Sequence, residues 1–257
     1  MGRNALRPSP HPLPGRSGMG ATLPEYHATR DSNETEIAMT RPRVPETDRG
    51  IQGTATVEAF DAFARRMRDK GFHPVKSYVE AGLARGEALE IGPGPGYVGL
   101  EWLKQCPDSS LTCIEISPDM IQVAERNART YGFENRTRYV SGDCQLMPFA
   151  DRSFDCVFSN GSLHEWARPD LAFAEIVRVL KTGGSFCVTD LRRDIGICAK
   201  WMGWSNARPA VMRAGFLSSV NAAYTAEELK ELLAGTKGVE FSVSEGFMHL
   251  AVAGRRC

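Results

Sequence analysis

The stretch that decides the fold is A-L-E-I-G-P-G-P-G-Y-V-G, residues 88–99. Its first four residues are typical of a short buried strand, and the segment from Tyr97 to Cys106 is typical of a helix. Between them, Gly92, Gly94 and Gly96 let the backbone take positive φ values and approach a ligand closely. A strand, a glycine-rich turn and a helix in this order predict a ligand-binding loop in an α/β domain.

Strands and helices alternate on both sides of this loop. Strands are predicted at 88–91, 111–116, 137–142, 154–160, 185–191, 239–243 and 247–253. Helices are predicted from Thr54 to Met67, from Pro74, over 97–106 and 118–131, from Pro169 to the Gly183-Gly184 pair, and after a capping box at Thr225 and Glu228. We therefore expect an α/β, Rossmann-like seven-stranded sheet, mostly parallel with an antiparallel last strand, with helices on both faces.

Length and composition limit the function classes. A chain of 257 residues suits one large domain. Equal numbers of Lys+Arg and Asp+Glu, 31 each, argue against a nucleic-acid-binding field. No apolar run reaches the roughly 18–20 residues of a membrane span, and seven cysteines without a C-x-x-C pair favour free thiols. We expect a cytoplasmic monomer or homodimer that binds neither nucleic acid nor membrane.

Residues 1–45 differ from the rest of the chain. They hold seven of the 15 prolines and no acidic residue before Glu25. Such a segment cannot bury a core, so we expect a disordered arm. A transit peptide, or an over-long start with Met39 as the natural first residue, remains open. The domain would then span 46–257, with N-terminal helices and a lid at 46–86 and a cover over an acceptor pocket at 192–223.

The loop indicates a cofactor that contains a nucleoside. Gly94, Gly96 and Gly99 fit G-x-G-x-x-G, and Glu115 ends the second strand about 20 residues later, where an acid binds ribose hydroxyls. These features suit either a nicotinamide dinucleotide or S-adenosylmethionine.

Three further residues favour S-adenosylmethionine. Glu90 places a carboxylate just before the loop, where it can accept bonds from a ligand ammonium or from loop amides but would repel a pyrophosphate. Asp143 follows the third strand and can accept a hydrogen bond from an adenine amine. Asn160 ends the fourth strand, where the predicted strand order reverses and α/β sheets bind ligands.

Four segments together carry a family resemblance. E-I-G-P-G-P-G (90–96), I-E-I-S-P-D-M (114–120), G-D-C-Q-L-M-P-F-A-D-R-S-F-D-C-V-F-S-N (142–160) and R-V-L-K-T-G-G-S (178–185) resemble the class I S-adenosylmethionine-dependent methyltransferases. The nearest branch is the ubiquinone/menaquinone-biosynthesis-like group that acts on small molecules.

The resemblance implies a set of cofactor-binding residues. Glu90, Gly92, Gly94 and Gly96 would border the methionine part, and Glu115 would bind the ribose. Ile116 would pack on the adenine, Asp143 would hold its amine with Cys144 presenting backbone beside it, and Asn160 would lie near the cofactor's amino group. Tyr97 either closes over the cofactor or belongs to the core.

The sequence offers fewer candidates for catalysis and acceptor binding than for cofactor binding. His164, in S-N-G-S-L-H-E-W (159–166), is the candidate general base, with a pocket-shaping role as the alternative. Trp201, Arg192 and Tyr224 are candidate contacts to the acceptor, although Arg192 could equally pair with neighbouring aspartates. The sequence contains neither an H-E-x-x-H motif nor a clustered Cys/His spacing, so no metal site is predicted.

The predicted function is methyl transfer from S-adenosylmethionine to a small-molecule acceptor. A non-catalytic S-adenosylmethionine-binding partner or sensor is the alternative. An NAD-dependent oxidoreductase is a remote one, because it leaves Glu90 and Asp143 unexplained.

Overall fold

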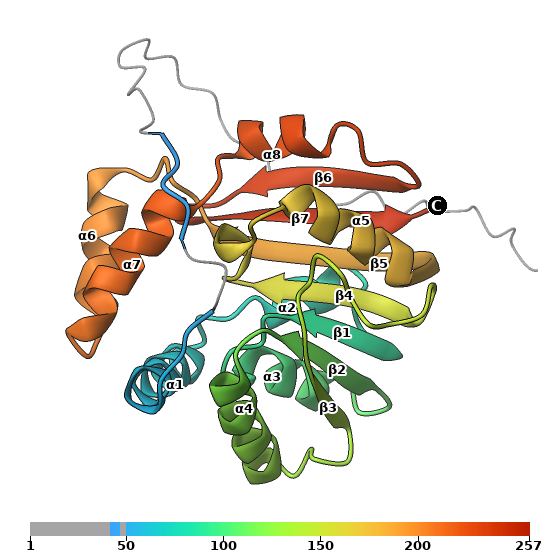
Figure 1. Ribbon diagram of the computed structural model, residues 1–257, viewed down its shortest axis with the longest axis horizontal. Coiled ribbons are helices and arrows are strands. Elements are labelled where there is room, and N and C mark those ends of the chain that lie inside the picture. The colour runs from blue at the N-terminus through green and yellow to red at the C-terminus, as the bar shows by residue number, and fades with distance from the viewer. Residues whose placement is uncertain (1–41, 47–49) are drawn as a thin grey trace, which may run out of the picture. The chain divides into compact units, whose positions relative to one another are not determined.

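The computed structural model describes residues 42–46 and 50–257. Within them, seven strands form one sheet in the order β3-β2-β1-β4-β5-β7-β6 (Figure 1). The strands are β1 (Glu87–Ile91), β2 (Ser110–Glu115), β3 (Thr137–Ser141), β4 (Phe154–Asn160), β5 (Leu180–Leu191), β6 (Val239–Glu245) and β7 (His249–Arg256). Strands β1 to β5 pair in parallel, and β7 is antiparallel to both of its neighbours. The predicted sheet, including its one antiparallel strand, is confirmed.

Helices cover both faces of this sheet. They are α1 (Thr54–Asp69), α2 (Val75–Glu80), α3 (Tyr97–Gln105), α4 (Pro118–Tyr131), the 3-10 turn η1 (Leu163–Glu165), α5 (Pro169–Val179), α6 (Ile197–Asn206), α7 (Val211–Ala222) and α8 (Ala226–Leu233). Helix α4 begins as its sequence predicts, with the Ser117 side chain accepting from the Met120 amide. The capping box of α8 at Thr225 and Glu228 is also formed.

Alternation along β1 divides the core in two. Leu89 and Ile91 lie in the larger cluster, with Phe173 of α5 and Leu229 of α8. Ala88, on the opposite face of β1, lies in a second cluster that includes Tyr78 of α2 and Trp102 of α3. Because successive side chains of a strand point to opposite faces, Glu90 shares the second face.

Two boundaries differ from the predicted ones. Helix α5 ends at Val179, and β5 begins at Leu180 rather than at 185, because Leu180 is already extended and pairs with Phe154. The strand pairing then shifts register beside Gly183 and Gly184, so the glycines mark an irregularity within the strand rather than the end of the helix. The turn between β6 and β7 comprises residues 246–248 rather than 244–246 and is closed by a bond from the Gly246 amide to the His249 carbonyl, 2.7 Å.

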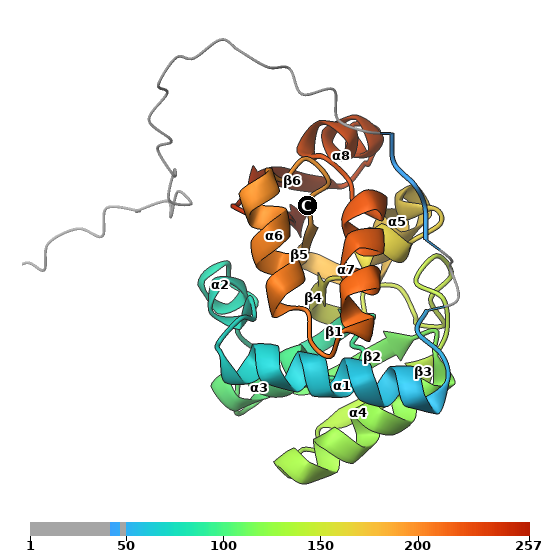
Figure 2. The same ribbon diagram turned by 90° about the vertical axis from the view of Figure 1, so that its left-hand side faces the viewer.

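The segment predicted as a pocket cover forms α6 and α7. Figure 2 looks at the end of the sheet where β4 finishes and shows α6 and α7 beside α1. The Arg66 guanidinium of α1 donates to the Asn206 carbonyl at the end of α6, 3.1 Å. The cover is therefore tied to α1 at the edge of the sheet where parallel strands end.

Residues 1–41, most of the predicted arm, lie outside the described residues. Residues 42–45, which the sequence assigns to that arm, contact the domain instead. The Val44 amide donates to the Asn221 carbonyl, 3.0 Å, and the Arg43 Nε donates to the Ala222 carbonyl, 2.6 Å. Across the part of the chain that the structure describes, no helix combines the length and apolar character needed to cross a bilayer.

Candidate active site

The glycine-rich loop joins β1 to α3 at the carboxyl edge of the sheet. Gly92, Gly94 and Gly96 have φ values of 61°, 53° and 84°, which residues with a Cβ rarely adopt. A Cβ at Gly92 would also lie 2.7 Å from the Cβ of Ser162, in the loop after β4. The turn therefore requires glycine, and it places the loop directly against the segment that carries His164.

Glu115 ends β2 beside this loop and is buried. Its two oxygens accept hydrogen bonds from the amides of Gly94, 3.2 Å, and Ser117, 2.9 Å. Burial raises the pKa of this carboxyl, and these backbone amides act in the opposite direction. A carboxylate can accept about four hydrogen bonds, so Glu115 retains acceptor capacity for ribose hydroxyls.

The segment before α1 lies over this carboxylate. A Cβ at Gly50 would meet the Ile116 side chain at 2.7 Å and would lie 3.7 Å from a Glu115 oxygen. The Ser117 hydroxyl donates to the Ile51 carbonyl, 2.6 Å, and the Gly53 amide donates to Asp119, 2.9 Å. Ile116 remains partly exposed, as a side chain that packs on an adenine would require.

Glu90 is buried on the second face of the sheet, under α3. Its carboxyl accepts from the Cys113 thiol, 3.8 Å, and from the Gly99 amide, and no room remains for a side chain at position 99. Burial raises its pKa to about 8. Two roles were predicted for Glu90, binding a ligand ammonium or binding backbone amides, and the structure shows a bond to a backbone amide.

The remaining cofactor candidates, Asp143, Cys144 and Asn160, lie at the ends of β3 and β4, at the same edge of the sheet. Asp143, two residues after β3, is half-buried and accepts from both the Gln145 amide, 2.8 Å, and the Gln145 side chain, 2.8 and 3.0 Å. Cys144 beside it is half-buried, and burial raises the pKa of its thiol. Asn160 ends β4 with its side chain exposed, accepting from the Thr189 hydroxyl, 3.0 Å. The structure thus brings the predicted cofactor residues to one edge.

Two positions were predicted for Tyr97, over the cofactor or in the core, and the structure places it in the core. Its hydroxyl donates to Asp61 of α1, 2.9 Å, and its ring lies 4.6 Å from the Arg68 guanidinium. Sequence analysis missed Asp61, which is completely buried and also accepts from Asn127, 2.9 Å. Asn127 in turn donates to the Pro95 carbonyl, 2.9 Å, so this network holds the glycine-rich loop from behind. The sequence signal that could have identified Asp61 was a single acidic residue on the apolar face of α1.

His164 is held by a second carboxylate that sequence analysis did not assign to it. Nδ1 lies 2.9 Å from each oxygen of Asp190, and the His164 amide donates to Asp190, 2.7 Å. Burial alone lowers the pKa of this imidazole, but Asp190 opposes it and the net pKa is about 9. Burial raises the pKa of the neighbouring Glu165 to about 7. An imidazole with a pKa near 9 is protonated at neutral pH, which counts against its acting there as a general base.

The three acceptor-contact candidates have different surroundings in the structure. Trp201 lies on α6 and is 68% exposed. Tyr224 is buried, with the Arg43 guanidinium 4.2 Å above its ring. Arg192 binds Asp194 through two bonds of 2.7 Å and Glu245 at 3.1 Å, so its guanidinium braces the loop after β5, as the alternative interpretation held.

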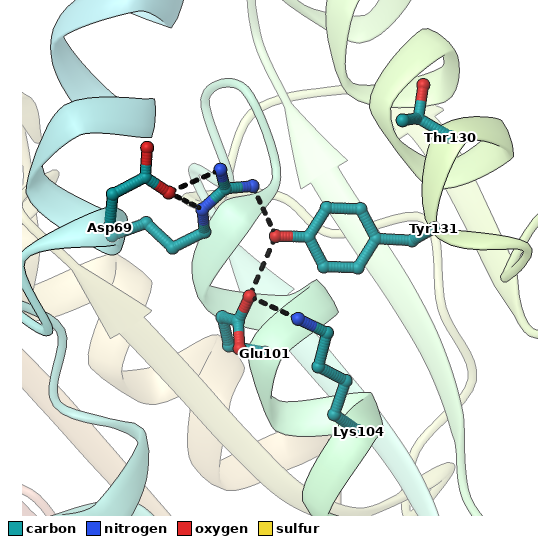
Figure 3. Close-up of a pocket in the computed structure, with 6 residues that line it drawn as sticks. Asp69, Glu101, Lys104, Thr130 and Tyr131 are labelled. Atoms are coloured by element: carbon teal, nitrogen blue, oxygen red, sulfur yellow. Dashed lines mark hydrogen bonds and ion pairs between the residues drawn. The ribbon is translucent and has the colours of Figure 1, made fainter.

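A shallow pocket of about 470 Å³ lies elsewhere, between α1, α3 and α4 (Figure 3). Tyr131 stands at its centre, accepting from Arg68, 2.5 Å, and donating to Glu101, 2.7 Å. Lys104 binds the same Glu101, 2.8 Å, and Arg68 binds Asp69, 2.6 Å. These charged groups pair with one another, so the pocket offers no convergent set of groups for a ligand.

Comparison with known proteins agrees with this geometry. Residues 89–188, which run from β1 through the loop and the three carboxyl-edge positions to β5, match the family described as a methyltransferase domain. Residues 89–188 therefore form a methyltransferase domain, in the fold of the class I S-adenosylmethionine-dependent methyltransferases. The match covers the core of the fold and leaves the segments that flank it, α1 and the α6–α7 cover, outside.

Relatives of this methyltransferase domain act on different acceptors. The chain is 30% identical over 142 residues to a demethylmenaquinone methyltransferase of Porphyromonas gingivalis, covering 53% of this chain and 57% of that protein. It is 37% identical over 103 residues to the sterol 4-C-methyltransferase strm-1 of Caenorhabditis elegans, covering 40% and 30%. The aligned parts thus span less than two thirds of these curated relatives.

A solved structure extends the likeness of fold. A putative S-adenosyl-L-methionine-dependent methyltransferase from Methanococcus maripaludis superimposes with a TM-score of 0.64 at 21% identity, over 79% of this chain and 96% of that one. The methyltransferase fold therefore includes the elements that surround the matched core.

Proposed function

We propose that this protein transfers a methyl group from S-adenosylmethionine to a small-molecule acceptor. The observation that carries the proposal is the buried Glu115 carboxylate, fixed against the Gly94 amide at the carboxyl edge of the sheet. Ribose-binding acids occupy this position in nucleoside-binding α/β folds. Glu90, Asp143 and Asn160 then extend the site along the ends of β1, β3 and β4, the set predicted for the methionine and adenine parts.

The chain's own residues would act by orientation. When bound, S-adenosylmethionine supplies an electrophilic methyl group on a positively charged sulfur. Glu115 would fix the ribose through hydrogen bonds, and the glycine-rich loop, held from behind by Asn127, would set the distance of the reacting carbon from the acceptor. Alignment of reacting atoms accounts for much of the rate of such displacements, so the site requires no strong base.

His164 would face the acceptor rather than the cofactor. It follows the end of β4 and is fixed by Asp190, so its ring has one orientation. We propose that it shapes or charges the acceptor pocket, with proton removal as the competing role. The His164→Gln variant tests whether His164 acts on the acceptor or on the cofactor. If it acts on the acceptor, turnover should fall while the dissociation constant for S-adenosylmethionine stays unchanged.

The class of acceptor is inferred from the cover. Helix α6 of the cover carries three large, exposed apolar side chains, Trp201, Met202 and Trp204. An apolar cover that closes over an acceptor excludes water and suits a hydrophobic acceptor. Demethylmenaquinone and sterol methyltransferases among the relatives support a search that begins with ring-containing apolar acceptors. We also propose a cytoplasmic location, in keeping with seven free cysteines, and a monomer or homodimer.

The decisive experiment is calorimetric titration of the purified full chain with S-adenosylmethionine, S-adenosylhomocysteine and NAD. Micromolar binding of the first two and none of NAD is expected. Binding of NAD alone would overturn the roles of Glu90 and Asp143. Binding without turnover on any acceptor tested would favour the partner or sensor alternative.

A further inference from the structure

Three metal-ligand side chains meet on one side of the His164 ring. Glu46 reaches it from the segment before α1, and Glu165 follows it in η1. One ligand atom from each residue lies within 4.8 Å of the other two. The side chains are 19%, 6% and 28% exposed for Glu46, His164 and Glu165, so the cluster is partly closed to solvent.

The distances within this cluster do not suit hydrogen bonds. His164 Nε2 lies 3.5 Å from a Glu46 oxygen and 3.9 Å from a Glu165 oxygen, whereas N–H···O bonds are about 2.7–3.2 Å long. Nitrogen and oxygen ligands lie about 2.0–2.2 Å from a zinc ion, which in a tetrahedral site places them roughly 3.3–3.6 Å apart. The Nε2–Glu46 distance falls in this range and the Nε2–Glu165 distance lies just above it, so a small movement of the Glu165 side chain would let the three atoms share one ion.

The opposite edge of the imidazole has the support that a metal-binding histidine needs. Nδ1 lies 2.9 Å from both Asp190 oxygens, and Asp190 is itself buried at the end of β5. When Nδ1 donates to a carboxylate, the direction of Nε2 is fixed, and a metal ion would bind there in place of the proton that Nε2 carries at neutral pH. Here that direction is toward Glu46 and Glu165.

Glu46 is brought to the cluster by contacts of its own segment. Arg43 donates to the His164 carbonyl, 2.8 Å, and to the Ala222 carbonyl, 2.6 Å, and its guanidinium stacks on Tyr224. The Val44 amide adds a bond to Asn221. The carboxylate is thus placed by backbone and cation–π contacts that do not involve the carboxylate itself.

We propose that Glu46, His164 and Glu165 bind one divalent first-row metal ion. One imidazole and two carboxylates suit Zn²⁺ or Mn²⁺ better than Mg²⁺, which prefers oxygen ligands. Three protein ligands leave at least one coordination position open. The ion would also join the segment 42–46 to η1. This inference rests on the cluster alone and not on the proposed methyl transfer.

The sequence predicts no metal site, because two of the ligands adjoin in η1 and the third comes from a segment far away in the chain. Only the fold brings them together. Spacing motifs recognise sites built on one helix or loop and cannot recognise this one.

The test is metal binding by the full chain, stripped with a chelator and measured without cofactor or acceptor. ZnCl₂ is followed by calorimetry and MnCl₂ by loss of the free-ion electron paramagnetic resonance signal, with MgCl₂ as the oxygen-preferring comparison. We expect one ion per chain, with Mg²⁺ bound at least tenfold more weakly. Glu46→Gln and Glu165→Gln should each weaken binding tenfold or more. Asp190→Asn, which removes a support and not a ligand, should weaken it about 10–100-fold.

The matched control is Glu227→Gln, which removes an exposed carboxylate on α8 and should leave metal affinity unchanged. Circular dichroism of each variant, and its affinity for S-adenosylmethionine, show whether the fold and the cofactor site are retained. Absence of Zn²⁺ and Mn²⁺ binding to the wild-type chain would overturn the proposal. So would wild-type affinity in Glu46→Gln and Glu165→Gln, since the ion would then be held elsewhere, for example by the exposed thiols of Cys198 and Cys257. Neither outcome depends on whether the protein transfers methyl groups.

Discussion

Glu115 is the single side chain on which cofactor affinity should depend most. Its hydrogen bonds to ribose hydroxyls would be charge-assisted, and bonds of that kind contribute about 1.5–3 kcal/mol together with the cost of leaving a partner unmet. Glu115→Gln should therefore weaken S-adenosylmethionine binding about 10–100-fold. Calorimetry measures this directly, with the exposed Glu227→Gln as control. An unchanged dissociation constant would remove the ribose role from Glu115.

Glu90 makes a different prediction, because its buried carboxyl has a pKa of about 8 and the unfolded chain ionises near its ordinary value of 4.5. Between these two pH values the unfolded state has lost a proton that the folded state retains, so the stability contributed by this group falls as pH rises from about 5 to 8. Glu90→Gln removes that dependence. Urea unfolding at pH 5 and pH 8.5 should show the variant gaining stability relative to wild type at the higher pH. An equal difference at both pH values would contradict the burial of a protonated carboxyl.

Helix α1 holds the glycine-rich loop from behind, through Asp61 and its bonds to Tyr97 and Asn127. Asp61→Ala should lower the free energy of unfolding by about 2–4 kcal/mol, because it leaves buried donors unmet. It should also weaken S-adenosylmethionine binding, since Asn127 holds the Pro95 carbonyl of the loop. Urea unfolding and calorimetry report the two effects separately.

The control for that change is Glu58→Ala, on the same helix. Glu58 pairs with Arg126, as Asp61 does, but it is exposed, and exposed pairs contribute about 0–1 kcal/mol. A loss for Asp61→Ala no greater than for Glu58→Ala would mean that the buried network does not hold α1 to the loop.

The elements that the sequence predicts well are those with strong local signals. The glycine-rich loop, the Ser117 cap and the Thr225–Glu228 capping box each depend on residues a few positions apart, and all three form as predicted. The start of β5 was wrong by five residues, because pairing of Leu180 with β4 outweighs the local glycine signal. The partners of His164 could not be predicted either. Asp190 and Glu46 reach it only through the pairing of β4 with β5 and the path of the chain before α1, and no local pattern encodes those contacts.

The folded domain as a whole should respond to its cofactor. Ligand that binds only the native state stabilises it by about 2.7 kcal/mol at a hundred times its dissociation constant. For a chain of this size each kcal/mol raises Tm by about 2–4 °C, so saturating S-adenosylmethionine or S-adenosylhomocysteine should raise it by about 5–10 °C. NAD should leave Tm unchanged if the site requires the methionine part of S-adenosylmethionine, because the adenine and ribose are common to both cofactors. The Asp143→Ala variant distinguishes a specific effect from a general one. Its Tm without ligand should stay close to that of wild type, since the carboxylate bonds to the nearby residues Cys144 and Gln145, while its shift with S-adenosylmethionine should shrink. A full shift in this variant would mean that the adenine amine is held by another group along the ends of β2 and β3.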